Sequence, residues 1–473
     1  AFWLSSSELP NTFSGQTRKR RIVSSWWWYN AIHQTSLRHK LTFFLHTSFT
    51  VSKDGGTGTS THFYDHLRLL DFYAYGNIKT LAKKITFDNS MLIYLNNTTN
   101  NANNPNENYA REFLELFTIL KGPQITEGNY TNYTELDIQQ AAKVFSGIKV
   151  QYDRSIIDPD TNLPKGRIAV GNHDTTNKTF SSAFDNQTIT GGNSEETIIN
   201  ELDSFVEMIF EKEATAKSFC RKLYRFYVKS EITDEIENDI IVPLASTFRS
   251  NYNLQEVLDQ LLLSQHFYDL DDSDNSDELI GGLIKSPLDL VLQTLNIVEY
   301  PVPDPITHGL DHYKHFYQWQ MVLAVMDPAG QHPFWPPSVV GFPANYESPD
   351  FDKFWFNTSS IIFRYKLGDI LLTSWRTKAE FSVTNFVENN VSSPGNASQL
   401  VSDLLHIFFP EDIDVDRLSY FVSDILLDNS TLTESMWEDE WVTYANTGDA
   451  SVVEDVLRSL FRSILWSQEY QSN

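Results

Sequence analysis

The stretch of sequence that decides the fold is Pro105-Asn106-Glu107-Asn108-Tyr109-Ala110-Arg111-Glu112-Phe113-Leu114-Glu115-Leu116-Phe117-Thr118-Ile119-Leu120. Pro105 and Asn106 signal a helix start, with Asn106 as N-cap and Glu107 favoured in the first turn by the helix dipole. At helical spacing one face is apolar, and it carries Tyr109, Phe113, Leu116, Phe117 and Leu120. The opposite face carries Asn108, Arg111, Glu112 and Glu115. Glu107–Arg111 and Arg111–Glu115 are spaced i,i+4, so one guanidinium can bridge two carboxylates. This polar face is either a solvated surface or the wall of a polar site.

Similar apolar spacing recurs along most of the chain. It predicts helices at 26–50, 62–75, 77–86, 106–120, 135–147, 195–211, 213–229, 234–250, 253–266, 279–299, 360–373, 396–409, 414–427 and 450–466. Residues 148–195 lack that period and predict a long ordered insertion, with a small hairpin near 148–181. Residues 300–360 are rich in proline and aromatic residues, which predicts an irregular wrap. We therefore expect a mainly α fold with a 1–25 extension, a 26–360 helical domain and a 361–473 helical subdomain.

Composition excludes several classes of protein. The 473 residues include 36 basic and 62 acidic side chains, a net charge of −26. Nucleic acid is therefore an unfavourable partner, because phosphate neutralisation needs a basic surface. The single cysteine, Cys220, allows neither an internal disulfide nor a thiolate metal cluster, and its apolar surroundings predict a buried structural thiol. The sequence contains no run of about 18 apolar residues, so it predicts no membrane-spanning helix. Motifs of the common serine hydrolases, NTPases, zincins and dinucleotide enzymes are absent.

A set of motifs along the chain resembles one bacterial protein family. They are the Asn-Glu-Asn-Tyr-Ala-Arg-Glu-x-x-Glu-Leu string at 106–116, together with segments at 36–49, 133–142, 172–178, 221–228, 284–287 and 330–341. As a set they resemble the family called domain of unknown function 1800, over roughly residues 26–470. That family has no settled activity. Its members are usually exported from Gram-negative cells, so the resemblance implies a periplasmic, cell-surface or extracellular protein.

The resemblance places two groups of residues in motif positions. One is the polar face of the 106–120 helix, called the polar stripe below, and the other consists of residues elsewhere in the chain. The candidate catalytic residues are Glu107, Arg111, Glu112, Glu115, His173, Asp174 and Lys178, and the candidate metal ligands are His46, Glu112, Glu115, Asp137 and His173. Carboxylates with one or two imidazoles suit Mg, Mn, Ca or Fe, so a divalent metal ion is a candidate cofactor. Three interpretations remain open: a buried salt-bridge network around Arg111, a polar pocket without metal, and a metal site. Phe117 occupies a position where relatives often carry histidine; if that histidine were essential, this chain would be inactive or act differently.

Two segments outside this set have their own interpretations. The acidic run Asp269–Glu278 resembles a calcium loop only loosely, and we interpret it as a solvated turn. The aromatic–proline segment Gly330–Pro337 forms either the floor of a cleft on which sugars stack or a rigid wrap over the core.

Two functions from different classes fit the sequence. The first is an exported hydrolase-like or metal-assisted acid/base enzyme acting on a polymer or surface-bound substrate. The second is a non-catalytic cell-surface or periplasmic protein with a structural polar network, and a glycan or a cell-surface protein as partner. Solvent-accessible Glu112, Glu115 and His173 would favour the enzyme, whereas the same side chains paired and sealed would favour the second function.

Overall fold

The computed structural model describes residues 15–52, 57–268, 282–305, 307–373, 381–409, 413–428 and 431–473. Helices make up 60% of the described residues, and the sheets among those residues are small and two-stranded, so the predicted mainly α fold is confirmed. The chain divides into two compact units. Unit 1 comprises the residues up to Asn30 with Gln34–Ser273 and Phe334–Phe351, and unit 2 comprises Ala31–His33, Asp274–Pro333 and Asp352–Asn473. The acidic run 269–278 lies outside the described residues.

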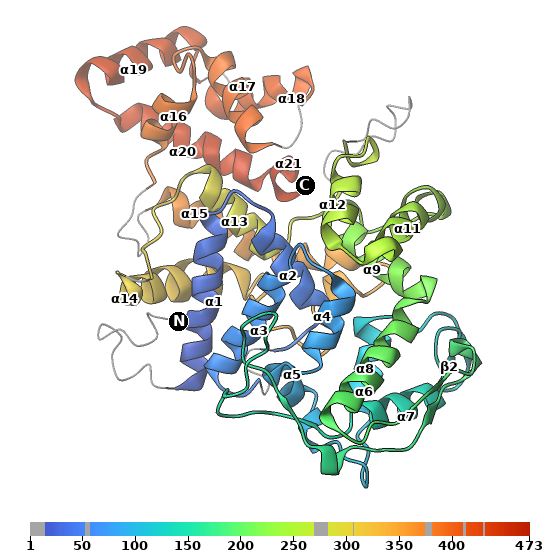
Figure 1. Ribbon diagram of the computed structural model, residues 1–473. Coiled ribbons are helices and arrows are strands. Elements are labelled where there is room, and N and C mark those ends of the chain that lie inside the picture. The colour runs from blue at the N-terminus through green and yellow to red at the C-terminus, as the bar shows by residue number, and fades with distance from the viewer. Residues whose placement is uncertain are drawn as a thin grey trace. The chain divides into compact units, whose positions relative to one another are not determined.

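Unit 1 holds most of the motif segments and all the strands described (Figure 1). Its longer helices are most of α1 (Gln16–Ile32), α2 (Arg38–Ser48), α3 (Ser60–Phe72), α4 (Ile78–Ile85), α5 (Asn89–Tyr94), α6 (Asn108–Glu112), α7 (Glu135–Val144), α8 (Glu195–Phe210), α9 (Glu213–Tyr227), α11 (Val242–Asn251) and α12 (Leu254–Leu262). Its short helical segments are η3 (Asn97–Thr99), η4 (Phe113–Phe117), η5 (Val170–Asn172), η6 (Ser182–Phe184), α10 (Asp234–Ile236), η7 (Glu237–Ile241), η8 (His266–Tyr268) and η11 (Pro343–Asn345).

The irregular stretches of unit 1 are pinned by three antiparallel hairpins. The strand pairs are β1 (Gln124–Thr126) with β2 (Asn129–Tyr130), β3 (Ile148–Lys149) with β4 (Arg167–Ile168), and β5 (Lys178–Thr179) with β6 (Thr188–Ile189). The hairpin expected near 148–181 is therefore present as β3–β4. The helices that follow begin at side-chain caps, as at Ser194, whose hydroxyl accepts a hydrogen bond from the Thr197 amide.

The helix predicted for 106–120 is present, but its second half is not α-helical. The α-helical part is α6, and the chain then continues as the π-helix η4 until Phe117. The element ends at Phe117, and Leu120, three residues further on, has a left-handed backbone with φ +62°. The wider turn rotates the later side chains, so Leu116 and Leu120 are only half-buried while Leu114 is fully buried. A π-helix beside a polar cluster is common at functional sites.

An aromatic core lies beneath this helix. Phe145, directly after the end of α7, contacts Tyr109, Phe113 and Phe205 edge-on, with ring centroids 4.8, 5.1 and 5.4 Å away. All four rings are fully buried. Phe117 is also fully buried, so the position where relatives often carry histidine belongs here to the core. The core fixes α6, α7 and α8 together, and Figure 1 shows these helices close to one another.

Unit 2 is helical almost throughout. It contains α13 (Pro287–Ile297), α14 (Gly309–Asp311), η9 (His312–Gln320), η10 (Val322–Met326), most of η12 (Phe351–Trp355), α15 (Ile361–Leu372), α16 (Val383–Asn390), α17 (Ala397–Phe408), α18 (Val415–Tyr420), η13 (Phe421–Leu426), α19 (Glu434–Thr447), α20 (Ser451–Trp466) and α21 (Gln468–Gln471). The expectation of an irregular 300–360 wrap is wrong over 309–326, where η9 and η10 are π-helices. Burial of residues such as Tyr317 and Val322 outweighs the low helix propensity of aromatic and β-branched side chains.

Two further differences concern helix ends and short helices. The single helix expected at 26–50 is two helices, α1 and α2, separated by the polar segment 33–37. Its serine, threonine and glutamine residues favour a turn because hydroxyl side chains compete for backbone hydrogen bonds. Helices α5, α16, α19 and α21 were not expected. Most other predicted helices are present with ends shifted by a few residues, the usual uncertainty of boundaries.

Candidate functional site

Arg111 is the centre of a half-exposed ion cluster on α6. Its guanidinium binds Glu135 in two-pronged fashion, at 2.7 and 3.1 Å, and contacts Glu107 at 3.4 Å. Hydrogen bonds from Arg111 lower the pKa of Glu135. Side-chain exposures are 37% for Arg111 and 39% for Glu135, so this ion pair lies at the surface. It joins α6 to the first turn of α7, but it is half-exposed and is not the buried network that one interpretation of the sequence expects.

Glu115 is held by the hairpin that follows the π-helix. Its carboxylate forms an ion pair with Lys121 and accepts a hydrogen bond from the Tyr133 hydroxyl at 3.1 Å. Burial is the largest cause that raises the pKa of Tyr133, and the charge of Glu115 is the next. Glu115 is therefore fixed in place by partners on both sides of the β1–β2 hairpin.

Glu112 differs from every other carboxylate of the stripe. It is half-buried, and the described part of the chain offers it no hydrogen bond and no ion pair. Burial, with a smaller contribution from the neighbouring Glu115 charge, raises the pKa of Glu112 to about 7. The charge of Glu112 in turn contributes to a raised pKa of Tyr94, after burial. Glu112 is a carboxyl group that can both give and take a proton near neutral pH.

Replacing Arg111 with alanine should destabilise the protein only slightly. Because the pair with Glu135 is half-exposed, we expect a loss of about 1 kcal/mol or less in the free energy of unfolding. Urea denaturation of the wild type and the variant measures it. A loss above about 3 kcal/mol would mean that the carboxylates left behind are sealed from water.

Glu112→Gln should change how stability depends on pH. A carboxyl whose pKa is higher in the folded than in the unfolded state binds its proton more tightly when the protein is folded. Its contribution to the free energy of unfolding therefore falls as pH rises from about 4.5 to about 7. The variant should match the wild type near pH 4 and exceed it at pH 8, by roughly 1–2 kcal/mol after solvent screening. Denaturation at both pH values tests this; equal stabilities at pH 8 would contradict it.

Asp137 uses both oxygens within the fold. Oδ2 accepts hydrogen bonds from the amide and hydroxyl of Thr134, which closes the N-terminal capping box of α7. The Ser181 amide donates to Oδ1 at 2.7 Å, and the Ser181 hydroxyl donates to Oδ2 at 2.6 Å. The side chain is fully buried. Asp137 thus links the start of α7 to the end of β5.

His173, Asp174 and Lys178 belong to a second, sealed cluster around Glu201 of α8. The Glu201 carboxylate is 3.0 Å from His173 Nε2 and 2.7 Å from Lys178 Nζ, and it accepts the Gly192 amide at 2.6 Å. The side chains of His173, Lys178 and Glu201 are all 0% exposed. Lys178 also donates to the Asp174 carbonyl, while His173 Nδ1 lies 2.7 Å from the Ser146 carbonyl. All of these contacts lie within the protein, and the Lys178 ammonium compensates the buried charge of the Glu201 carboxylate.

Sequence reasoning missed Glu201. The available signal was its position, because Glu201 falls on the apolar face of its helix next to Ile198, Leu202 and Phe205. A charged residue in an apolar stripe requires a buried partner. That partner is Lys178, 23 positions earlier, which the local pattern does not reveal.

His46, the remaining candidate, ends α2 in an apolar environment. It is 1% exposed, and its Nε2 lies 2.9 Å from the Val51 carbonyl. Burial lowers the pKa of His46 to about 3, with a smaller contribution from the neighbouring His66. Glu112 and Glu115 therefore share the stripe, Asp137 binds Ser181, and His173 binds Glu201. Among the described residues no group of three or more His, Cys, Asp or Glu side chains is arranged to hold a metal ion.

Comparison with known proteins identifies the family. The model of a protein family of unknown function, DUF1800, matches residues 10–471. The chain belongs to this family. No curated protein and no solved structure matches the DUF1800 chain. Within the described part of this DUF1800 protein, no helix combines the length and the hydropathy that crossing a bilayer requires.

Proposed function

We propose that this DUF1800 protein is an exported, hydrolase-like acid/base enzyme in which Glu112 transfers the proton. The observation that carries the proposal is the half-buried Glu112 carboxyl, which has no hydrogen-bond or ion-pair partner among the described residues. The other charged side chains of the polar stripe are all paired. Its pKa of about 7 supports the same role, because proton transfer is most efficient when the pKa lies near the working pH.

The surroundings of Glu112 supply a second carboxyl group with different partners. Glu115 is three residues away, in the π-helix η4 that continues α6, and is paired with Lys121 and Tyr133. Two neighbouring carboxyl groups in unlike environments divide the acid and base roles between them. Arg111 and Lys121 flank the pair and would stabilise negative charge that develops on the substrate. The family's usual export supports a polymer or surface-bound substrate.

Glu112→Gln tests the enzyme proposal. Wild type and variant are assayed against polysaccharides, peptidoglycan and polyesters across pH 5–9. We expect the variant to lose about 10²–10⁴-fold in kcat/KM and to lose any titration near pH 7. Glu127→Gln, at the exposed tip of the β1–β2 hairpin, is the matched control and should retain activity. A wild type that turns over none of these substrates, or an active Glu112→Gln variant, would overturn the proposal.

The second candidate is a non-catalytic surface protein. It is favoured by the Glu201 cluster, which is sealed from solvent, and by the Arg111–Glu135 ion pair, in which both charges already have a partner. In that case the binding groups are exposed aromatic residues of the 334–351 segment, such as Trp335 and Tyr346. Glycan-array binding by the wild type that is weakened by Trp335→Ala and unaffected by Glu112→Gln would support it. Binding to no glycan, or binding that Trp335→Ala leaves intact, would argue against it.

A further inference from the structure

Two buried imidazoles lie next to each other in unit 1, outside the polar stripe. His46 lies in the last turn of α2, and His66 lies in the middle of α3. They are 1% and 0% exposed. Their ring centroids are 6.0 Å apart and their planes meet at 79°. Neither ring belongs to the site proposed above.

One nitrogen of each ring is anchored by an acceptor. The Val51 carbonyl can only accept, so His46 Nε2, 2.9 Å away, carries the hydrogen and Nδ1 is left with a lone pair. His66 Nδ1 lies 3.0 Å from Asp88 Oδ1, so it donates to that carboxylate and leaves Nε2 with a lone pair. Both tautomers are thus fixed by their neighbours.

The two remaining nitrogens have no hydrogen-bond partner in the part of the chain that the structure describes. Aromatic rings pack around His46, with Phe334 at 4.9 Å and Phe43 at 6.0 Å between centroids. A buried acceptor without a partner costs about 1–3 kcal/mol, so two of them on adjacent rings require an explanation. One bound group that accepts both lone pairs would satisfy them together.

We propose that His46 Nδ1 and His66 Nε2 together bind a late first-row metal ion of the copper–zinc type. Neutral imidazole is a preferred ligand for these ions, whereas Mg²⁺ and Ca²⁺ require oxygen. Metal-binding histidines almost always donate their other N–H to a carboxylate or a backbone carbonyl. His66 has the first arrangement, with Asp88, and His46 has the second, with Val51.

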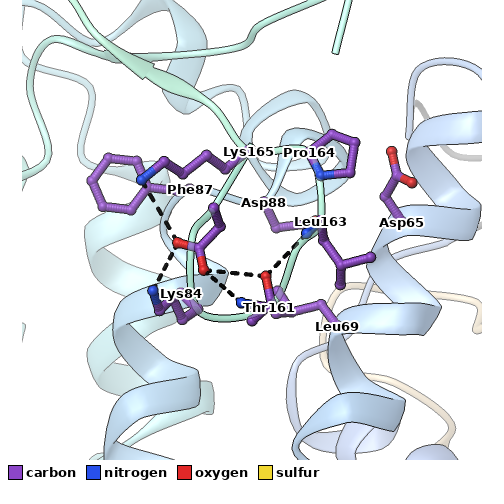
Figure 2. A pocket seen from close by; sticks show the side chains of 10 residues that line it. Asp65, Leu69, Lys84, Phe87, Asp88, Thr161, Leu163, Pro164 and Lys165 are labelled. Carbon is purple, nitrogen blue, oxygen red and sulfur yellow. Dashed lines mark hydrogen bonds and ion pairs between the residues drawn. The ribbon is translucent and has the colours of Figure 1, made fainter. Parts of the chain in front are cut away.

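The charges around the pair suit a bound cation. Asp65 is neutralised by Arg154, which binds it through two hydrogen bonds of 2.6 and 2.9 Å, so the Asp88 carboxylate balances the metal charge. Asp88 and Asp65 also line a cavity with Lys84 and Asp158, which Figure 2 shows from close by. The cavity has room for little more than a water molecule, and neither imidazole lines it, so Asp88 alone links it to the histidine pair.

Metal content and X-ray absorption of the wild-type protein test the site directly. Protein stripped with a chelator is loaded with Zn²⁺, or with Cu⁺ under ascorbate, and then desalted. We expect one retained equivalent of at least one of the two ions, with imidazole scattering at about 2.0 Å, and no retained Mg²⁺ or Ca²⁺. Retention of Zn²⁺ alone or Cu⁺ alone identifies the ion. The proposal would be overturned if the protein retained no metal ion, or if the absorption spectrum showed no imidazole ligand. A crystal soaked with the metal that showed only a water molecule between the two nitrogens would also overturn it.

Variants separate the site from adventitious binding. His46→Gln and His66→Gln should lose the equivalent, whereas His62→Gln on the same helix should retain it. Asp88→Asn should weaken metal affinity about 10–100-fold, because it removes the negative charge from the acceptor of the His66 Nδ1 hydrogen. It keeps an oxygen able to accept the Met91 amide, which caps α5, so the fold is spared. Full retention by both ligand variants would overturn the proposal, and if neither folds, the wild-type absorption spectrum decides.

Discussion

Glu201→Ala is expected to lower the free energy of unfolding by about 3–5 kcal/mol, the largest effect of any single substitution considered. The change leaves the fully buried Lys178 ammonium without its carboxylate and removes the acceptor of both His173 and the Gly192 amide. Breaking a buried pair on one side costs far more than the pair contributes, because the remaining charge stays desolvated. Chemical denaturation at neutral pH measures the loss.

A matched control lies on the same helix. Glu207 of α8 also pairs with a lysine, Lys79, at 2.8 Å, but its side chain is 47% exposed. Glu207→Ala should therefore cost about 1 kcal/mol or less. Equal losses in the two variants would mean that the Glu201 cluster is open to water, and the sealed-network interpretation would fail.

Asp137→Ala is expected to cost about 2–4 kcal/mol, the second largest effect. The substitution removes the acceptor of four hydrogen bonds, two from Thr134 and two from Ser181, in a fully buried position. The capping interaction alone is worth about 1 kcal/mol, and the stranded Ser181 donors add to it.

Thermal or chemical denaturation measures the Asp137 effect, and hydrogen exchange locates it in α7 and β5. Asp203→Ala is the control, because that aspartate is 46% exposed and, among the described residues, pairs with Lys83 alone. A loss below about 1 kcal/mol for Asp137→Ala would show that its contacts are dispensable.

The sequence predicts local structure where one period dominates. The apolar repeat of 213–229 predicts α9 with its ends within two residues. The capping box of Thr134 and Asp137 was not predicted, although its spacing is present in the sequence. The π-helix η4 could not be predicted, because a shift from i+4 to i+5 hydrogen bonding leaves no composition signal. Regular α-helical spacing places Leu116 and Leu120 on the buried face, and the π-helix turns them away from it.

The candidate site was predictable only in part. The i,i+4 rule finds the Arg111–Glu107 contact, but the stronger partner is Glu135, which tertiary packing brings from another helix. The same limit hides Glu201 and His66, whose contacts span 23 or more positions or lie between separate helices. Local spacing identifies which residues need partners, and it does not identify the partners.

The Glu201 cluster also determines how the chain should behave after it is cut. Residues 185–188 form an exposed stretch between Lys178 and Gly192, where a protease can reach the backbone. A single nick there would place His173 and Lys178 on one fragment and Glu201 on the other. The buried ion pair would then tie the fragments together without a peptide bond. The nicked protein should elute as one species and separate only on denaturation.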